Sequence, residues 1–233
     1  MPQEREPAQL PLDLSQEPGL TRDELVVTGA NAAAASLVDS WPEWPSRVVV
    51  LAGPAGSGKS HLAAIWRERA GAATALASAI SSDAIEAAAS GRAVLIDGID
   101  GGVDETGLFH LINAVREGAG HLLIASRRFP VAWGVRLPDL VSRLKAATIV
   151  EIAEPDDLLL GAVVTKLFAD RQVQVEPHVV TYIVNRIERS LATAMEVVDR
   201  LDQAALARKT RITRALAAEI VGASDEGQGA LPF

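Results

Sequence analysis

One short stretch near the start of the chain, Gly53–Ser60, constrains the fold more than any other. It reads Gly-Pro-Ala-Gly-Ser-Gly-Lys-Ser and fits the pattern G-x-x-x-x-G-K-[ST] without a mismatch. A β-branched apolar run, 47–52, precedes it, and a helix-forming segment, 61–69, follows it. In this strand–loop–helix context the glycines let backbone N–H groups turn toward phosphate oxygens, and the helix start adds its positive dipole end. The stretch therefore predicts a phosphate-binding loop; the alternative is a glycine-rich turn without a ligand.

Lysine and serine at the end of this loop carry the expected chemistry. Lys59 is expected to reach the β- and γ-phosphates of a nucleotide, and the Ser60 hydroxyl to ligate Mg²⁺. The nucleotide-binding residues predicted here are Gly53, Pro54, Ala55, Gly56, Ser57, Gly58, Lys59, Ser60 and His61. The expected cofactors are ADP or ATP with Mg²⁺.

A second acidic element is expected at the end of a neighbouring strand. Asp97 closes the apolar run 93–97 and fits a Walker B aspartate that holds Mg²⁺ through water. Many P-loop ATPases have glutamate at the next position, where this chain has Gly98. Slow hydrolysis by the chain itself is therefore expected.

Apolar strands alternate with helices up to residue 154, and only helical patterns follow. Such alternation predicts an α/β domain with a parallel sheet covered on both faces. Strands are expected at 47–52, 74–77, 93–97, 121–126 and 148–151, and helices at 31–40, 59–70, 82–89, 106–116 and 137–143. Further helices are expected at 155–171, 177–186, 191–208 and 213–221. The predicted organisation is a disordered tail 1–20, an α/β domain 21–154, a helical domain 155–222 and a flexible tail 223–233.

Composition excludes several classes of protein. The net charge of −8 argues against broad, nonspecific affinity for nucleic acid, which needs a basic face. The chain has no cysteine, so disulfides, thiolate catalysis and cysteine-ligated metals are excluded. Neither a signal peptide nor an apolar run of membrane-spanning length is found. A soluble cytoplasmic protein is expected.

Three further features each leave two interpretations open. The leucines of Gln9-Leu-Pro-Leu-Asp-Leu14 suit an extended peptide that docks in a partner's groove or folds back on its own domain. Ser126 ends an apolar strand, where a polar residue either senses a γ-phosphate or stabilises a turn. Arg143 stands at the end of a short helix, where an arginine can reach a neighbouring subunit's phosphate, but the residues alone favour an ordinary surface arginine.

Together these motifs resemble the AAA+ ATPases, and more narrowly the DnaA/Hda branch. The resemblance covers residues 22–221 and is most specific in the loop Gly53–Ser60 with His61-Leu62, the Asp97 strand, Ser126, and Leu-Val-Ser-Arg143-Leu. The family's box VII arginine falls on Arg143, which raises the expectation of an arginine finger. The chain ends about ten residues after the helical lid, which leaves no room for the DNA-reading domain of DnaA, so the Hda group is the better match.

This resemblance also implies partners. Members of the Hda group carry an N-terminal peptide that binds the β sliding clamp of DNA polymerase III, and Gln9, Leu10, Leu12 and Leu14 are similar to it. The C-terminal residues Gln228, Leu231 and Phe233 repeat the spacing, either as a second clamp motif or by chance. DnaA is the second implied partner, with little or no direct DNA binding, and a homo-oligomer stays open.

One position departs from the family pattern. The lid of these proteins usually has a sensor 2 arginine, and alignment places Ala192 there. Either Arg186 or Arg189 replaces it, or the lid contacts the nucleotide weakly, which fits a protein that holds ADP stably.

The function implied by the resemblance is negative regulation of DNA replication initiation. Such a protein binds adenine nucleotide and the clamp, and stimulates hydrolysis of DnaA-bound ATP through Arg143, with weak or no ATPase activity of its own. The alternatives are an autonomous P-loop ATPase or kinase, and a clamp-bound adaptor in which the nucleotide is structural.

Overall fold

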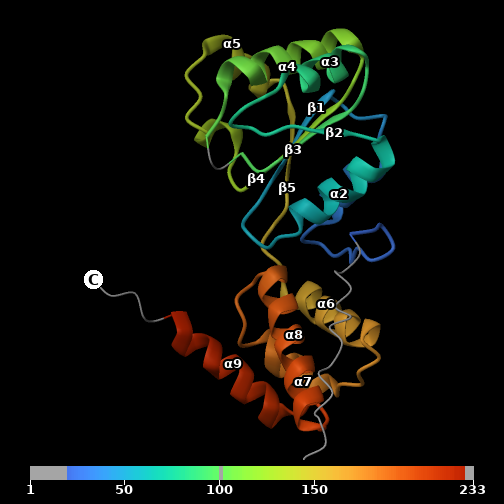
Figure 1. Cartoon of the computed structure of the whole chain (residues 1–233), viewed down its shortest axis with the longest axis vertical. Coiled ribbons are helices and arrows are strands. Elements are labelled where there is room, and N and C mark those ends of the chain that lie inside the picture. Colours follow the sequence, from blue (N-terminus) through green and yellow to red (C-terminus); the bar gives the residue numbers. More distant parts are fainter. Residues whose placement is uncertain (1–19, 100–101, 229–233) are drawn as a thin grey trace, which may run out of the picture.

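The computed structural model describes residues 20–99 and 102–228, with side chains up to Gly222. A five-stranded parallel sheet lies at the centre of the first domain. Its strand order is β2-β3-β4-β1-β5, so β1 lies between β4 and β5 (Figure 1). The strands are β1 (Val48–Ala52), β2 (Ala73–Thr74), β3 (Val94–Asp97), β4 (Leu122–Ser126) and β5 (Thr148–Glu151). In the register, Val50 lies beside Ile124 on one side and Ile149 on the other.

Strand side chains alternate between two separate hydrophobic cores. In β1, Val48 and Val50 belong to the core shared with α3 (Ser82–Ala89), α4 (Glu105–Gly118) and α5 (Pro138–Lys145). Val49 and Leu51 belong to the core on the opposite face, shared with α1 (Ala32–Asp39) and α2 (Lys59–Ala70). β1 is therefore apolar at every position, and β3 and β4 are apolar up to their last residues, which is the pattern that predicted a sheet covered on both faces. The α/β class is confirmed.

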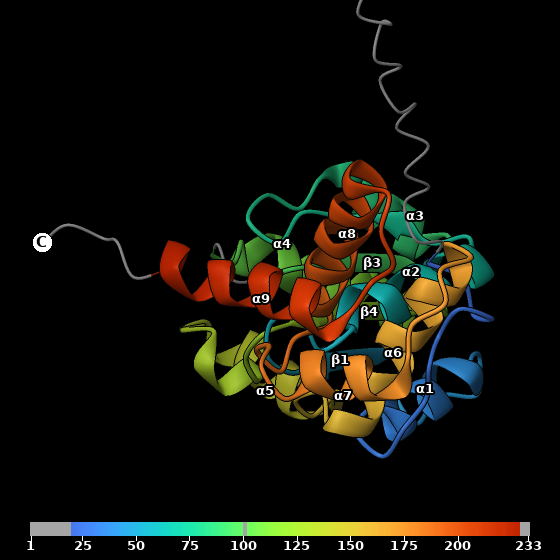
Figure 2. The ribbon, with the colours of Figure 1, turned by 90° about the horizontal axis from the view of Figure 1, so that it is seen from below.

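Four helices make up the second domain, whose core is its own. They are α6 (Asp157–Asp170), α7 (Pro177–Val184), α8 (Leu191–Arg208) and α9 (Arg214–Gln228). Phe168, Ile183, Val198 and Ala217 are among the side chains that pack together between them. This helical lid lies at one end of the sheet, and Figure 2 shows it from below, with α8 lying over the sheet and the far end of α9 projecting beyond it. Within the described ranges, no helix has the length and apolar character needed to cross a bilayer.

Side-chain caps explain why several helices begin where the sequence predicts. Ser81, Asp104, Asp156 and Ser190 each accept a hydrogen bond from the backbone N–H three residues later, which satisfies a donor that the first helical turn leaves open. The last helix differs from its prediction, since α9 continues to Gln228 instead of ending near residue 221. Gly222 lowers helix stability by about 1 kcal/mol relative to alanine but keeps its N–H, so it does not end the helix.

Asn31 precedes α1, and its side chain does not cap that helix. Instead Oδ1 accepts from the Thr28 N–H at 2.8 Å, and Nδ2 donates to the Val26 carbonyl at 2.8 Å. The amide side chain offers both a donor and an acceptor, and a turn needs both. Asn31 therefore holds the turn before the helix.

An aromatic cluster covers the sheet at the start of β4. His121 meets the edges of Trp41 and Trp44, with ring centroids 6.0 Å and 5.6 Å away, and Trp44 stacks on Trp66 at 5.1 Å. Burial lowers the pKa of His121 below its usual 6.5, and the positive charge of Arg47 lowers it further. The neutral imidazole is thus the form that the fold favours.

This histidine predicts a pH dependence of stability. Because its pKa is lower in the folded chain, the unfolded chain binds the proton first as the pH falls below about 6.5. The His121 contribution is therefore complete above that pH and is lost as the pH falls toward the folded pKa, by at most about 1.4 kcal/mol per unit. In urea unfolding at pH 7.5 and 5.5, the wild type is expected to lose more stability than His121→Phe. Equal losses would contradict the assignment.

Candidate functional site

The phosphate loop leaves the sheet at its central strand. The Gly53 N–H donates to the Ser126 carbonyl at the end of β4, at 3.1 Å, and the Ile152 N–H donates to the Ala52 carbonyl at 2.7 Å. A Cβ on Gly53 would lie 2.4 Å from the carbonyl oxygen of Ile152. Glycine is therefore required here, since the backbones of three strands converge.

Within the loop, left-handed glycines fold the backbone around the lysine. Gly56 and Gly58 have φ values of +69° and +92°, which favour glycine strongly. Lys59 is only 9% exposed, and its Nζ donates to the Pro54 carbonyl at 2.6 Å and to the Ser57 hydroxyl at 3.3 Å. The Lys59 ammonium is thus held beside the backbone and hydroxyl oxygens of its own loop.

The two predicted Mg²⁺ ligands lie together, although they are far apart in the sequence. The Ser60 hydroxyl donates to Oδ1 of Asp97 at 3.2 Å, across the gap between α2 and the end of β3. Over the described residues, no three His, Asp or Glu side chains gather as a metal site. Ser60 and Asp97 thus offer two oxygen positions, and other ligands would come from phosphate and water, as Mg²⁺ prefers.

Ser126 lies beside the loop, but its hydroxyl is occupied. It is 1% exposed and donates to the Arg128 carbonyl at 2.7 Å. It also accepts from Trp133 Nε1 at 3.0 Å and from the Arg128 N–H at 3.1 Å. These contacts hold the turn after β4 and the short η1 helix (Pro130–Ala132). The turn interpretation has geometric support, and the sensor role stays a prediction.

The start of α8 rests directly on the phosphate loop. The Leu191 N–H donates to the Gly56 carbonyl at 2.8 Å, and Cδ1 of Leu191 lies 3.3 Å from where a Cβ on Gly58 would be. A Cβ on Gly56 would lie 2.0 Å from Oγ of Ser190. The sequence indicated Ser190 only by its place before a helix, and nothing in it pointed to this contact between domains.

The candidate replacements for sensor 2 have other contacts. Ala192 is exposed. The Arg186 guanidinium lies 3.9 Å from the ring centroid of Tyr182 within the lid. Arg189 pairs with Asp157 at the start of α6, at 3.0 Å, with both side chains at least half exposed. An exposed pair of this kind is weak, so Arg189 is the more available of the two arginines.

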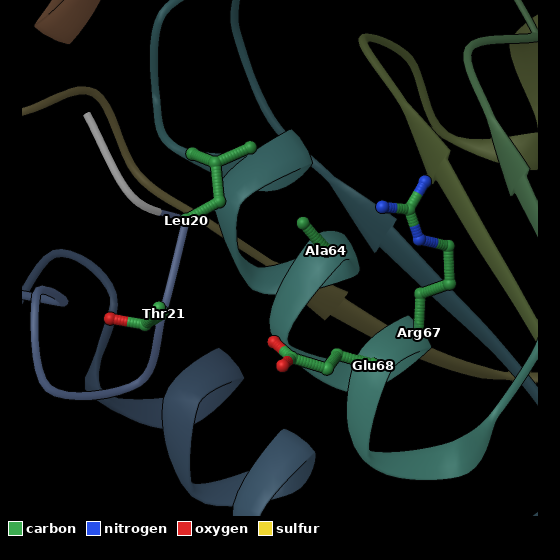
Figure 3. A pocket seen from close by; sticks show the side chains of 5 residues that line it. All are labelled: Leu20, Thr21, Ala64, Arg67 and Glu68. Atoms are coloured by element: carbon green, nitrogen blue, oxygen red, sulfur yellow. The ribbon is translucent and has the colours of Figure 1, made fainter. Parts of the chain in front are cut away.

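His61 holds the segment that precedes α1. Its Nε2 donates to the Thr21 carbonyl at 3.0 Å. A shallow cavity lies between this segment and α2, and Figure 3 shows the side chains that line it, Leu20, Thr21, Ala64, Arg67 and Glu68. Ala64, Arg67 and Glu68 come from later turns of α2 than Lys59, so this cavity does not coincide with the phosphate loop.

Arg143 lies on α5, and its side chain rests on the neighbouring helix. Its guanidinium carbon is 5.2 Å from the ring centroid of Phe109 on α4, and its Nε is buried without a hydrogen-bond partner. Within the described part of the chain, Arg143 forms no ion pair. A guanidinium that is half-buried without a counter-ion is prepared to meet an anion from outside.

The predicted docking peptides cannot be compared with the structure. Gln9, Leu10, Leu12, Leu14, Leu231 and Phe233 lie outside the described residues. Gln228 is the last residue of α9.

Comparisons with known proteins agree with this architecture. Residues 163–220 match the family model described as "Hda, lid domain". Domain III of the replication initiation protein DnaA from Thermotoga maritima superposes with a TM-score of 0.70 and 16% identity, over 88% of this chain and 96% of that one. The chain therefore has the fold of DnaA domain III, and its residues 163–220 resemble the Hda lid. Its predicted class, an α/β AAA+ domain followed by a helical lid, is thereby confirmed.

Other solved structures share the AAA+ fold, with similar TM-scores and sequence identities. The RuvB Holliday junction branch migration motor of T. maritima gives a TM-score of 0.68 at 18% identity, over 88% of this chain and 72% of that chain. AMPPCP-bound DnaA from Aquifex aeolicus gives 0.66 at 17% identity, over 80% and 66%. An uncharacterized protein of Haemophilus influenzae is 30% identical over 110 residues, which is 47% of this chain and 48% of that protein. The match spans about half the length of that relative.

Proposed function

We propose that this protein stimulates hydrolysis of ATP held by a DnaA-type partner, to which it supplies Arg143 as an arginine finger. The observation that carries the proposal is the state of Arg143, half-buried against Phe109 and without an ion pair in the described residues. α5 packs on α4 and η1, whereas the phosphate loop of the same chain contacts the lid. The guanidinium therefore serves a phosphate outside its own domain better than one inside it.

An arginine at this position would stabilise the negative charge that develops on the γ-phosphoryl group during hydrolysis. The γ-phosphoryl group carries its developing charge on equatorial oxygens, and a guanidinium offers a planar fork of donors that matches them. Arginine fingers of this kind contribute about 10³–10⁵ in rate. In the proposed complex the partner contributes its own bound ATP, and this chain contributes one residue to a composite site.

The chain's own phosphate loop would bind ADP or ATP. Lys59 would exchange its loop oxygens for phosphate oxygens, and Ser60 with Asp97 would hold Mg²⁺, which neutralises phosphate charge when bound. The left-handed glycines of the loop have no Cβ, so they do not block the approach of a phosphate to the loop N–H groups. A nucleotide here would fix the loop against α8 and keep the lid in place. The AMPPCP-bound DnaA relative supports this assignment through its fold.

The Mg²⁺ assignment gives a prediction for Asp97→Asn. The amide keeps the size of the side chain but loses its charge, so ADP affinity in Mg²⁺ is expected to fall about 10–100-fold. Affinity in EDTA should be unchanged. Calorimetric titration with ADP under both conditions measures this. A loss of equal size with and without Mg²⁺ would show that Asp97 supports the loop and not the ion.

We further propose that Gln9, Leu10, Leu12 and Leu14 tether the protein to the β sliding clamp. A tether raises the local concentration of Arg143 near a partner on the same DNA without any new contact at the site. Single-turnover hydrolysis of DnaA-bound ATP with clamp-loaded DNA tests the function. Wild type is expected to accelerate it, and Gln9→Ala to act only at much higher protein concentration. No acceleration by wild type at any concentration would overturn the proposal.

An autonomous ATPase is the second candidate, and the Ser60–Asp97 contact favours it because the metal position is formed. Against it, Gly98 offers no carboxylate to orient water. Robust turnover of ATP by the isolated chain would support this alternative. A clamp-bound adaptor with a structural nucleotide would instead act fully without Arg143.

A further inference from the structure

We propose that one face of α4, formed by Glu105 and Phe109, sets the position of Arg143, and that both are positioning residues for the stimulated hydrolysis. The inference rests on the proposed function, because positioning matters only if Arg143 acts on a phosphate. Glu105 and Phe109 are four residues apart on the same helix, so they lie on one face, one turn apart.

Glu105 holds the chain at the point where α5 begins. Its Oε1 accepts from the Arg136 N–H at 3.1 Å, and its Oε2 accepts from the same N–H at 3.0 Å and from the Leu137 N–H at 2.7 Å. Leu137 is the N-cap of α5, and its side chain makes no capping bond. The next residue, Pro138, has no N–H. A carboxylate from α4 therefore provides the acceptor that α5 lacks, and it lies near the positive end of that helix.

Phe109 holds the other end of the same helix. Its ring lies under the Arg143 guanidinium, with 5.2 Å from the guanidinium carbon to the ring centroid. On the apolar side of α5, Leu140 and Leu144 are buried in the core shared with the sheet. α5 is thus fixed at its N-cap, along its apolar side and at the arginine itself, and two of these three supports come from α4.

Such fixing has a catalytic consequence. An arginine has several rotatable bonds, and a free one must lose that freedom when it meets its phosphate. Support from the ring and the clamped helix removes part of this loss before docking. Misplacement of a catalytic group by about 1 Å costs about 10²-fold in rate. Loss of either support should therefore reduce the maximal rate more than the affinity for the partner.

The test is single-turnover hydrolysis of ATP preloaded on DnaA with clamp-loaded DNA, over a range of concentrations of this protein. Phe109→Leu and Glu105→Ala are each expected to lower the maximal stimulated rate at least about 10-fold, with the half-saturating concentration changed less than about 3-fold. Glu105→Gln keeps a carbonyl oxygen for the Leu137 N–H and should restore most of the rate. Glu117→Ala, an exposed glutamate on the same helix, is the matched control and should match the wild type.

A second measurement reads the position of Arg143 without any partner. In arginine Nε–H NMR spectra, the Arg143 resonance, assigned by its absence in Arg143→Ala, is expected to be shifted by the ring and to lose that shift in Phe109→Leu. In Glu105→Ala it should move and broaden, and in Glu105→Gln it should return toward the wild-type position. If Arg143→Ala abolishes stimulation while Glu105→Ala and Phe109→Leu retain wild-type rates, the positioning inference is wrong and the proposed function stands. If Arg143→Ala itself is fully active, the proposed function fails first.

Discussion

Arg143→Ala is expected to lower the stimulated hydrolysis of DnaA-bound ATP by about 10³-fold or more, which is the range that arginine fingers contribute. The reason is specific to the site, because the planar fork of Arg143 rests on Phe109 and forms no ion pair among the described residues. Folding should change little. The guanidinium contributes one aromatic contact, worth about 0.5–1 kcal/mol, so the unfolding free energy should fall by about that amount.

Arg143→Lys serves as the control for charge alone. Lysine keeps the positive charge but loses the planar fork, so it should restore only a small part of the rate. Both variants should bind ADP and the clamp as the wild type does, since neither site includes position 143. Full stimulation by Arg143→Ala, with the protein folded and clamp-bound, would remove the finger from the account and favour the adaptor.

Gly56→Ala is expected to give a large structural effect for a single methyl group. The new Cβ would lie 2.0 Å from Ser190 Oγ and 2.8 Å from its Cβ, and the backbone would be held at φ +69°. Left-handed backbone costs about 1–2 kcal/mol for alanine, and overpacking about 1–3 kcal/mol more. A loss of about 2–5 kcal/mol follows, unless the lid moves away from the loop, in which case the Leu191 N–H loses its bond to the Gly56 carbonyl.

Gly71→Ala is the matched control for backbone strain. Gly71 ends α2 with φ +57°, and a Cβ added there would have no heavy atom of another residue within 4 Å beyond its chain neighbours. Gly71→Ala should lower the free energy of unfolding only by the backbone strain, about 1 kcal/mol. Urea unfolding followed by tryptophan fluorescence and amide hydrogen exchange at Leu191 compare the two variants. If Gly56→Ala costs no more than Gly71→Ala and Leu191 stays protected, the lid does not rest on the loop as described.

Features that are local in sequence were predictable. Helix α8 begins and ends where the helical pattern predicted, at Leu191 and Arg208. The loop motif placed Lys59, and Asp97 at the end of a strand lies beside Ser60 as expected. These predictions rest on the periodicity of apolar residues and on a motif whose flanking strand and helix are next to it in the chain.

Contacts between elements were not predictable from the same patterns. Ser190 indicates a helix start, but its approach to Gly56 depends on how the lid sits on the first domain. Glu105 reads as an ordinary acidic residue in the first turn of α4, and only the path of residues 134–137 shows that it binds the start of α5. The same holds for Ser126, whose hydroxyl accepts a hydrogen bond from the indole of Trp133. The turn that brings Trp133 to Ser126 has no periodic sequence pattern from which it could be predicted. Each of these depends on where two separately folded segments meet.

The proposed mechanism requires that the hydrolysed ATP is the one bound to DnaA. The deciding measurement loads DnaA with γ-labelled ATP and this protein with unlabelled ADP, mixes them on clamp-loaded DNA, and follows labelled phosphate in a single turnover. The account predicts a fast release of label that requires Arg143. Label that stays on DnaA, whatever the concentration of this protein, would contradict it.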